Sequence, residues 1–430
     1  MKTFLRSVVA LMMILAMLMP ASALAASPQE LYDEVWKLIN SRFVDEDKNG
    51  QDWRIWRNRY DKVLEDETDS YVAIESMLAS LDDRYTRFLD PEEFAEEGRS
   101  IKAQLFGIGI QIGSRGDKLL VISPIDETPA SEAGLQANDE ITEIDGKSTK
   151  GMTVKDAADL IRGEKGTKVK LMIRRKDKAD KLYEIMRDEI KLKAVSLKNP
   201  FDVAIPADLG YVKLSTFLSN KAAIEIKAAL KELGTKKGYI LDLRSNPGGL
   251  LSNAITIADD FLDDGSIVST VDRDGYKEIR WANKPVITNK PLVVLIDGGS
   301  ASASEILSGA LKDHNRAVLV GQRTFGKGLV QEINRLPGRS GVNITTQRYL
   351  TPNDTDINKL GIEPHFTVEI TEEDIKEKRD PQLQKGIAVL QEMVAGKSLK
   401  MMLTAAASEK SEKESATETA EALAKKKIRK

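Results

Sequence analysis

Four short, mainly apolar runs in the second half of the chain constrain its fold most strongly. Each contains at most one charged residue, and segments with helical periodicity separate them. The runs are Gly210–Leu214, Tyr239–Leu243, Leu292–Ile296 and Ala317–Val320. Apolar strands that alternate with helices are typical of a mainly parallel sheet with both faces covered. The sequence therefore predicts an α/β protein whose reactive groups lie at the carboxyl ends of the strands.

The turn after Leu292–Ile296 carries a candidate nucleophile. It reads Asp297-Gly-Gly-Ser-Ala-Ser-Ala-Ser-Glu305 and leads into a helix-like segment, 306–312. A serine on such a strand-to-helix turn is exposed above the sheet, where its hydroxyl can attack a substrate. The alternative is that Ser302 and Glu305 form a capping box and the hydroxyl only caps the helix. Ser300 and Ser304 compete for the role of nucleophile.

A lysine is the best candidate for the base that a serine nucleophile needs. The only histidines, His314 and His365, stand in no motif, whereas Lys327 lies in a glycine-containing loop after Ala317–Val320. A Ser/Lys pair is thus favoured over a Ser/His triad. To act as a base near neutral pH, the lysine needs its pKa lowered by roughly 3 units, which burial without a carboxylate partner can do. Phe325 and the flanking glycines add no negative charge.

The same loop offers a weaker alternative, a phosphate-binding loop. Gly321 and Gly326-Lys327 have the required spacing, but Gly328 follows where Ser or Thr should bind magnesium. Residues 329–334 also read as a strand, and the phosphate-binding motif needs a helix there. Nucleotide hydrolysis is therefore the less favoured function.

Residues 105–175 have a different texture, with short β-type runs between glycine turns. The motifs are Pro129–Leu135, Asn138–Ile141 and Ile144-Asp-Gly146, followed by a helix with Val154, Ala157, Ala158 and Ile161 on one face. This segment resembles a PDZ domain of the circularly permuted bacterial type. PDZ domains bind an extended chain terminus as an added strand. The alternative is that these glycines only relieve turns in a small β-domain.

The PDZ resemblance assigns residues to peptide binding. It implies that Phe106, Gly107, Ile108 and Gly109 form the loop that holds the terminal carboxylate. Ile108, Ile110 and Ile112 would form the strand to which the peptide adds. Arg162 ends the helix, and it is either a plain surface charge or a contact to the substrate terminus or to the neighbouring α/β core.

Three loops that follow predicted strands carry a wider resemblance. They are Arg244-Ser-Asn-Pro-Gly-Gly249, the serine turn, and Gly321–Gly328, and the segments 348–352 and 357–364 extend the match. From about residue 30 to 395 the chain resembles the C-terminal processing peptidases, which are tail-specific serine proteases. The resemblance implies a mainly parallel-sheet protease core, an N-terminal helical region and an inserted PDZ domain. It also implies a homodimer through the terminal helices and no cofactor.

The resemblance also assigns catalytic roles. Ser302 would be the nucleophile, Lys327 the base and Gln331 the residue that orients the lysine. The backbone amides of Gly248 and Ala303 would form the oxyanion hole. The substrates would be unfolded or flexible proteins recognised by their C-terminal ends. A catalytically silent PDZ scaffold is the alternative, and the intact set Ser302, Lys327 and Gln331 argues against it.

The N-terminus reads as a secretory signal peptide. Basic residues precede the apolar stretch Val8–Met19, and Ala23-Leu-Ala25 fits the cleavage rule. We expect export to the bacterial cell envelope, in the periplasm or outside the cell. The alternative is a retained membrane anchor.

The composition argues against several kinds of ligand. Loss of Lys2 and Arg6 with the leader lowers the formal net charge from −3 to −5, which gives no support to nucleic-acid binding. The absence of cysteine and the presence of two histidines likewise predict no disulfide and no metal site.

These patterns predict five segments. They are a signal peptide at 1–25, an N-terminal helical or dimerisation region at 26–100, a PDZ domain at 101–176, a protease core at 177–398 and a charged, disordered tail at 399–430. The basic end of the tail either stays solvated or contacts an anionic envelope polymer. The inserted PDZ domain is a candidate regulator that covers the active site until a chain end binds; its regulatory partner is unidentified.

Overall fold

A computed structural model describes residues 26–101, 105–116, 118–125, 128–136, 138–175, 178–190, 193–199, 201, 203–283, 285–409 and 411. The predicted signal peptide lies outside this described part. The chain divides into two compact units. Unit 1 combines the N-terminal segment up to Glu97 with Ser266–Trp281 and Gly326–Gly361. Unit 2 contains Gly98–Gly265, Ala282–Phe325 and the chain from Ile362 onward.

The helices of unit 1 match the predicted helical region. They are α2 (Pro28–Arg42), α3 (Arg54–Arg57) and α4 (Glu67–Ala79), with α5 (Pro91–Ile101) at the end of the segment. A capping box starts α2, because the Ser27 amide donates to Glu30 Oε2 at 2.7 Å and the Glu30 amide donates to Ser27 Oγ at 3.3 Å. Trp53 and Trp56 are buried in the core of these helices.

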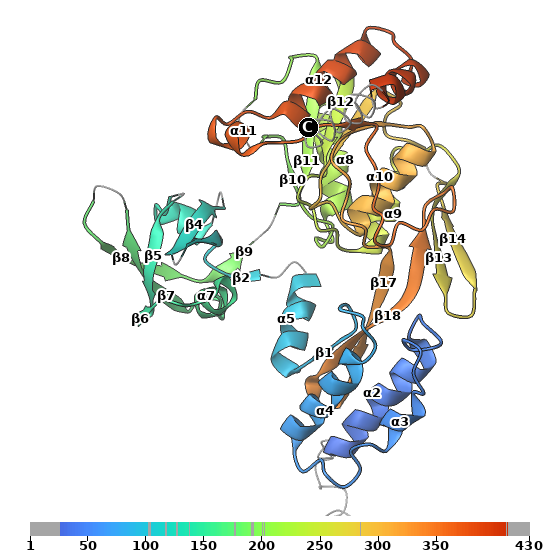
Figure 1. The fold of residues 1–430 in the computed structure, drawn as a ribbon. Coiled ribbons are helices and arrows are strands. Elements are labelled where there is room, and N and C mark those ends of the chain that lie inside the picture. The colour runs from blue at the N-terminus through green and yellow to red at the C-terminus, as the bar shows by residue number, and fades with distance from the viewer. Residues whose placement is uncertain are drawn as a thin grey trace, which may run out of the picture. The chain divides into compact units, whose positions relative to one another are not determined.

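The sheet of unit 1 was not predicted as a partner of these helices. Its strands are β1 (Arg87–Leu89), β13 (Ser266–Asp272), β14 (Lys277–Trp281), β17 (Leu329–Arg335) and β18 (Gly341–Leu350). The order is β1-β18-β13-β14, with β17 also paired to β18, and all pairs are antiparallel. Figure 1 shows β17 and β18, in orange, beside the blue helices. Val342 and Ile344 of β18 join the helical core.

The PDZ part of unit 2 extends beyond the predicted boundary at residue 176. Its main sheet has the order β3-β4-β5-β7-β8, with β6 paired to β5, and β2 pairs with β9. The strands are β2 (Leu105–Gly107), β3 (Ile110–Arg115), β4 (Lys118–Pro124), β5 (Glu140–Ile144), β6 (Lys147–Ser148), β7 (Lys168–Arg174), β8 (Lys181–Met186) and β9 (Asp188–Ile190), and the helices are α6 (Pro129–Glu132) and α7 (Val154–Ile161). Tyr183 and Ile185 of β8 lie in the PDZ core, and β9 pairs with β2, so residues 178–190 belong to this part and not to the protease core.

The predicted parallel sheet is present in unit 2. Its order is β10-β11-β12-β15-β16-β19, and only the edge pair of β10 and β11 is antiparallel. The strands are β10 (Val195–Ser196), β11 (Leu209–Leu214), β12 (Gly238–Asp242), β15 (Leu292–Ile296), β16 (Val318–Gly321) and β19 (Phe366–Thr367). The four apolar runs are thus adjacent strands, and their carboxyl ends meet at one edge.

Helices cover both faces of this sheet. The helices of this part are α8 (Ala222–Glu232), α9 (Leu251–Asp259), α10 (Ala303–Asp313), α11 (Glu372–Lys376), which has no buried residue, and α12 (Pro381–Val394). Ile240, Val293 and Val318 pack with α12 in one core cluster. Leu241 and Val294 alternate with these residues along the strands and are also buried, so the opposite face is covered too, and α8 and α10 contact the sheet there.

The first part of the predicted disordered tail is folded. Residues 399–409 are helical, and Met402 and Ala406 are buried in the same core as α12. The high content of Lys, Ser and Ala concealed this apolar contact. Residues 412–430 lie outside the described part of the chain. Among the described residues, no helix has the length and hydropathy of a membrane-spanning segment.

Candidate active site

The serine turn distinguishes its three serines. Ser300 and Ser304 have no exposed surface: Ser300 Oγ donates to the carbonyl of Leu243 at 2.8 Å, and Ser304 Oγ donates to the carbonyl of Asn246 at 2.9 Å. Ser302 is partly exposed. Both outer hydroxyls therefore fix the turn to the loop after β12, and Ser302 alone of the three is accessible.

Ser302 has a strained backbone at the start of α10. Its φ of 55° and ψ of −113° lie in a region that L-residues rarely adopt. The Ser302 amide donates to Glu305 Oε2 at 2.8 Å. Glu305 is fully buried, and its Oε1 accepts from Thr324 Oγ1 at 2.5 Å. Buried hydrogen bonds thus hold the strained conformation in place.

The loop after β12 lies directly against the serine turn. A Cβ on Gly248 would lie 2.6 Å from the carbonyl oxygen of Ala301 and 2.9 Å from the amide nitrogen of Ala303. Gly248 also has a φ of +97°, so no other residue fits without strain. The two amides assigned to the oxyanion hole therefore come from adjacent backbones. The Ala303 amide belongs to the first turn of α10, where amides have no intrahelical acceptor.

The Gly248 amide forms a hydrogen bond to the side chain of Asn246. Its Oδ1 accepts from that amide at 3.0 Å, and its Nδ2 donates to the carbonyl of Leu214 at 2.8 Å. Its own carbonyl accepts from the Ala301 amide at 3.0 Å. For Gly248 to donate to a substrate, its bond to Asn246 must be shared or broken.

A buried ionic network anchors the start of this loop. Arg244 donates to Asp242 at 2.7 Å and to Asp380 at 2.8 Å, and all three side chains are at most 7% exposed. Tyr211 donates to Asp242 Oδ2 at 2.7 Å. Burial opposes ionisation of Asp242, but the hydrogen bonds and charge of Arg244 hold its pKa below the ordinary value. Asp380 also caps α12, so the network links that helix to the glycine loop.

The predicted base belongs to unit 1. Lys327 is partly buried, and its Nζ lies 4.7 Å from the centroid of the Tyr85 ring. The Tyr349 hydroxyl donates to the carbonyl of Lys327. Burial lowers the pKa of Lys327. Two acids oppose this shift and two arginines reinforce it. The four charged residues are Asp83, Glu97, Arg84 and Arg87.

Gln331 lies on β17 next to β18. Its Nε2 is 3.5 Å from Thr345 Oγ1, which is long for a hydrogen bond. Thr345 Oγ1 in turn donates to Asp83 Oδ2 at 2.6 Å. The sequence reasoning missed Asp83, Tyr85 and Thr345, because no local pattern relates them to a loop so far along the chain.

Comparison with known proteins decides the family. Residues 208–368 match the model of Peptidase family S41, residues 120–175 a PDZ domain and residues 24–71 the Tricorn protease C1 domain. The chain is 40% identical over 381 residues to a carboxyl-terminal-processing protease of Synechocystis sp.. This alignment covers 86% of this chain and 88% of the relative. It is 41% identical over 322 residues to a carboxy-terminal-processing protease of Bartonella bacilliformis, and this alignment covers 73% of this chain and 72% of the relative. The chain is a carboxyl-terminal-processing protease of peptidase family S41.

A solved relative supports this assignment. The structure of a photosystem II D1 C-terminal processing protease is 34% identical to this chain, with a TM-score of 0.57, and covers 85% of this chain and 97% of its own. The protein therefore belongs to a family of serine peptidases, which argues against a silent PDZ scaffold as its function. The phosphate-binding loop is wrong as well, because strand β17 and not a helix follows Lys327. Among the described residues, no cluster of His, Cys, Asp or Glu has the arrangement of a metal site.

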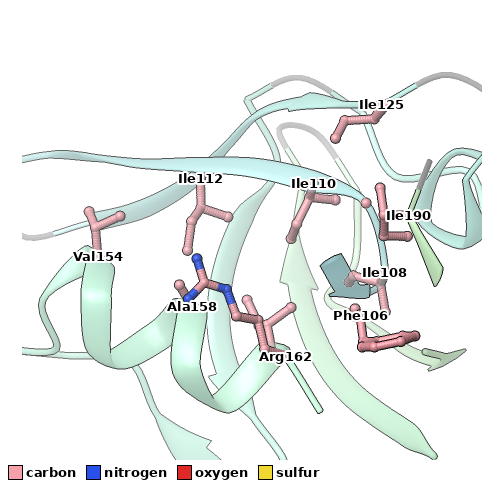
Figure 2. A pocket seen from close by; sticks show the side chains of 12 residues that line it. Phe106, Ile108, Ile110, Ile112, Ile125, Val154, Ala158, Arg162 and Ile190 are labelled. Carbon is pink, nitrogen blue, oxygen red and sulfur yellow. The ribbon is translucent and has the colours of Figure 1, made fainter. Parts of the chain in front are cut away.

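The PDZ domain of this protease contains an apolar pocket of about 310 Å³. Figure 2 shows side chains from the β2–β3 segment facing those of α7 across it. All seven residues named above as candidates for peptide binding line it: Phe106, Gly107, Ile108, Gly109, Ile110, Ile112 and Arg162. The sequence reasoning did not assign Ile125, Val154, Ala158, Ile161 and Ile190 to this pocket.

The structure corrects the predicted binding strand in one respect. Ile108 lies between β2 and β3, is 1% exposed and packs in the PDZ core, so β3 begins only at Ile110. Gly109 is required at its position, because its φ is +78° and a Cβ would lie 2.4 Å from Thr128. Arg162 is the C-cap residue of α7, and its Nη1 lies 3.6 Å from Asp159 Oδ1.

Proposed function

We propose that this protease is an exported endopeptidase that uses Ser302 as nucleophile and Lys327 as base, and that it recognises substrates by their C-terminal ends. One observation carries the choice of nucleophile. Ser302 is the accessible serine of the turn, with a strained backbone at the N-terminus of α10, whereas Ser300 and Ser304 are buried in structural hydrogen bonds. A strained, rigidly held residue is typical of a functional position.

Two observations support Lys327 as the base. Burial shifts its pKa in the direction that a neutral amine requires. The covalent chain also limits its distance from the serine turn. The Phe325 amide donates to the carbonyl of Ser300 at 3.0 Å, and Lys327 is two residues further on. Two peptide units span at most about 7.6 Å.

The proposed reaction proceeds by acyl transfer. Neutral Lys327 takes the proton from Ser302 Oγ, and the alkoxide attacks the carbonyl carbon of the peptide bond. The Ala303 and Gly248 amides stabilise the oxyanion of the tetrahedral intermediate. The Lys327 ammonium then protonates the leaving amine, and water repeats the steps to release the acyl group. Gln331 would orient the Lys327 side chain, and the reaction needs no cofactor.

We assign substrate recognition to the pocket between β3 and α7. An extended C-terminal segment would add as a strand beside β3, with its carboxylate at the Gly107–Gly109 loop and its apolar side chains in the pocket. The proposed mature protein starts after residue 25 and acts outside the cytoplasm, as a homodimer. Its PDZ domain would extend to about Ile190, where β9 ends.

Cleavage of an unfolded protein with an apolar C-terminus tests the catalytic assignment. We expect mass spectrometry to detect products with the wild type and none with Ser302→Ala or Lys327→Ala. Ser252→Ala and Lys231→Ala change exposed helical residues and serve as matched controls that retain activity. Cleavage that persists in Ser302→Ala would refute the choice of nucleophile.

A further inference from the structure

The aromatic ring next to Lys327 has no assigned role. Tyr85 lies in the segment between α4 and β1, within the same unit as the lysine. Its ring centroid is 4.7 Å from Lys327 Nζ, inside the range of about 6 Å in which a ring face attracts a cation. Tyr85 is itself partly buried, so little water separates the two groups.

Hydrogen bonds fix the Tyr85 segment to strand β18. The Tyr85 amide donates to Asp83 Oδ1 at 3.1 Å. Asp83 Oδ2 accepts from Thr86 Oγ1 at 2.7 Å and from Thr345 Oγ1 at 2.6 Å. The Thr345 amide donates to Thr86 Oγ1 at 3.0 Å. The ring is therefore held in place before any substrate binds.

Arg84 fixes the far end of the same side chain. Its guanidinium donates to the Tyr85 hydroxyl at 2.8 Å, and its Cζ lies 4.9 Å from the ring centroid. The hydroxyl thus bonds to Arg84, and the ring is the part of Tyr85 that meets Lys327. Any effect of Tyr85 on the amine must then come from the ring and not from its hydroxyl.

A ring face suits the chemistry of a lysine base. When the amine takes the serine proton it becomes an ammonium, and the negative potential of the ring face stabilises that ammonium. A carboxylate in direct contact would stabilise it so strongly that the amine would stay protonated. A ring gives a weaker attraction, which orients the amine and still allows it to lose its proton.

We propose that Tyr85 is the positioning residue for Lys327, and that its ring face holds the amine and stabilises the ammonium formed in each proton transfer. This inference rests on the proposed role of Lys327 as the base. The other charges that act on this amine are those of Asp83, Glu97, Arg84 and Arg87, and the tests below replace none of these four residues.

The pH dependence of kcat/KM tests this proposal. The full-length enzyme is prepared with Tyr85→Phe, Tyr85→Leu, and phenylalanines of increasing fluorine content at position 85. Fluorine withdraws negative potential from the ring face with little change in shape. We expect Tyr85→Phe to keep the acidic limb at the wild-type pH. Tyr85→Leu and the most fluorinated ring should move it down by about half a unit to one unit, because the ammonium loses stabilisation.

The fluorinated series keeps the test valid if Tyr85→Leu fails to fold. The same amino acids at Tyr276, an exposed residue of unit 1, are the control and should leave the limb unchanged. If the pH of the acidic limb does not change with fluorination at position 85, the proposal is overturned. Lys327→Ala separates this failure from the failure of the proposed function. If that variant keeps wild-type activity, Lys327 is not the base; if it is inactive while the limb ignores the ring, only the role of Tyr85 is wrong.

Discussion

At the scale of single residues, the site depends on backbone conformations that few side chains tolerate. The sequence predicted Ser302 and Gly248 through motif and resemblance, and their positive φ values agree with a functional turn. It could not choose between three serines by chemistry, because the hydrogen bonds that occupy Ser300 and Ser304 come from residues more than fifty positions away. Lys327 was predicted on the same grounds as Ser302, whereas no sequence motif pointed to Tyr85.

Gly248→Ala should remove most of the activity. The new Cβ would lie 2.6 Å from the carbonyl oxygen of Ala301, so the loop must move away from Ala303. Loss of one oxyanion donor typically lowers kcat by about a hundredfold to a thousandfold. We expect a fall of that size, measured by steady-state kinetics, with circular dichroism to check the fold.

Gly275→Ala is the matched control for this substitution. Gly275 also has a positive φ, of +81°, but no atom lies within 4 Å of its added Cβ. It should lose some stability and keep its kcat. Equal losses of kcat in the two variants would show that backbone strain, and not the position of Gly248, determines the effect.

At the scale of elements, the parallel sheet was predictable and the antiparallel sheet was not. The apolar strands β12, β15 and β16 are recognisable because both of their faces are buried. Strand β18 contains Asn343, Thr345 and Thr346, which are buried although polar, so its sequence does not reveal its place against the N-terminal helices. The β8 strand alternates exposed and buried residues, and its pairing with β7 could not be read from the sequence.

The network between β12 and α12 should make stability depend on pH. The folded pKa of Asp242 is below its ordinary value of 3.8, so the carboxylate stabilises the fold fully above that pH. Its contribution is lost as the pH falls through the folded pKa. We expect Asp242→Asn to lower the melting temperature at pH 7 and to reduce the loss of stability between about pH 5 and pH 2.

Thermal unfolding followed by circular dichroism across this pH range checks that expectation. Asp208→Asn is the control, because Asp208 forms an exposed pair with Lys237 and should change little. An unchanged pH slope in Asp242→Asn would mean that Asp242 is not responsible for the acid sensitivity.

At the scale of the whole molecule, each of the two compact units is built from segments that are far apart in the sequence. Ser302 belongs to unit 2 and Lys327 to unit 1, and the chain passes from one to the other between Phe325 and Gly326. The predicted protease core at 177–398 therefore contains segments of both units. Contacts between segments so distant in sequence determine this division, and local periodicity carries no information about them.

Replacement of residues 105–190 by a flexible linker should separate recognition from catalysis. Without the pocket between β3 and α7, the enzyme should lose its preference for substrates with an apolar C-terminus over those with an amidated or charged one. Competition between paired peptides, followed by mass spectrometry, measures this ratio. Arg162→Ala in the full chain tests the same site without a deletion. An unchanged ratio in the linker variant would contradict the assigned role of the PDZ domain.

Covalent labelling with a serine-reactive fluorophosphonate tests the central claim most directly. Peptide mapping after labelling identifies the modified residue, and Lys327→Ala shows whether the reaction needs the lysine. The account predicts one label on Ser302 in the wild type and almost none in Lys327→Ala or Ser302→Ala. A label on another serine, or labelling of Ser302 at the wild-type rate in Lys327→Ala, would contradict it.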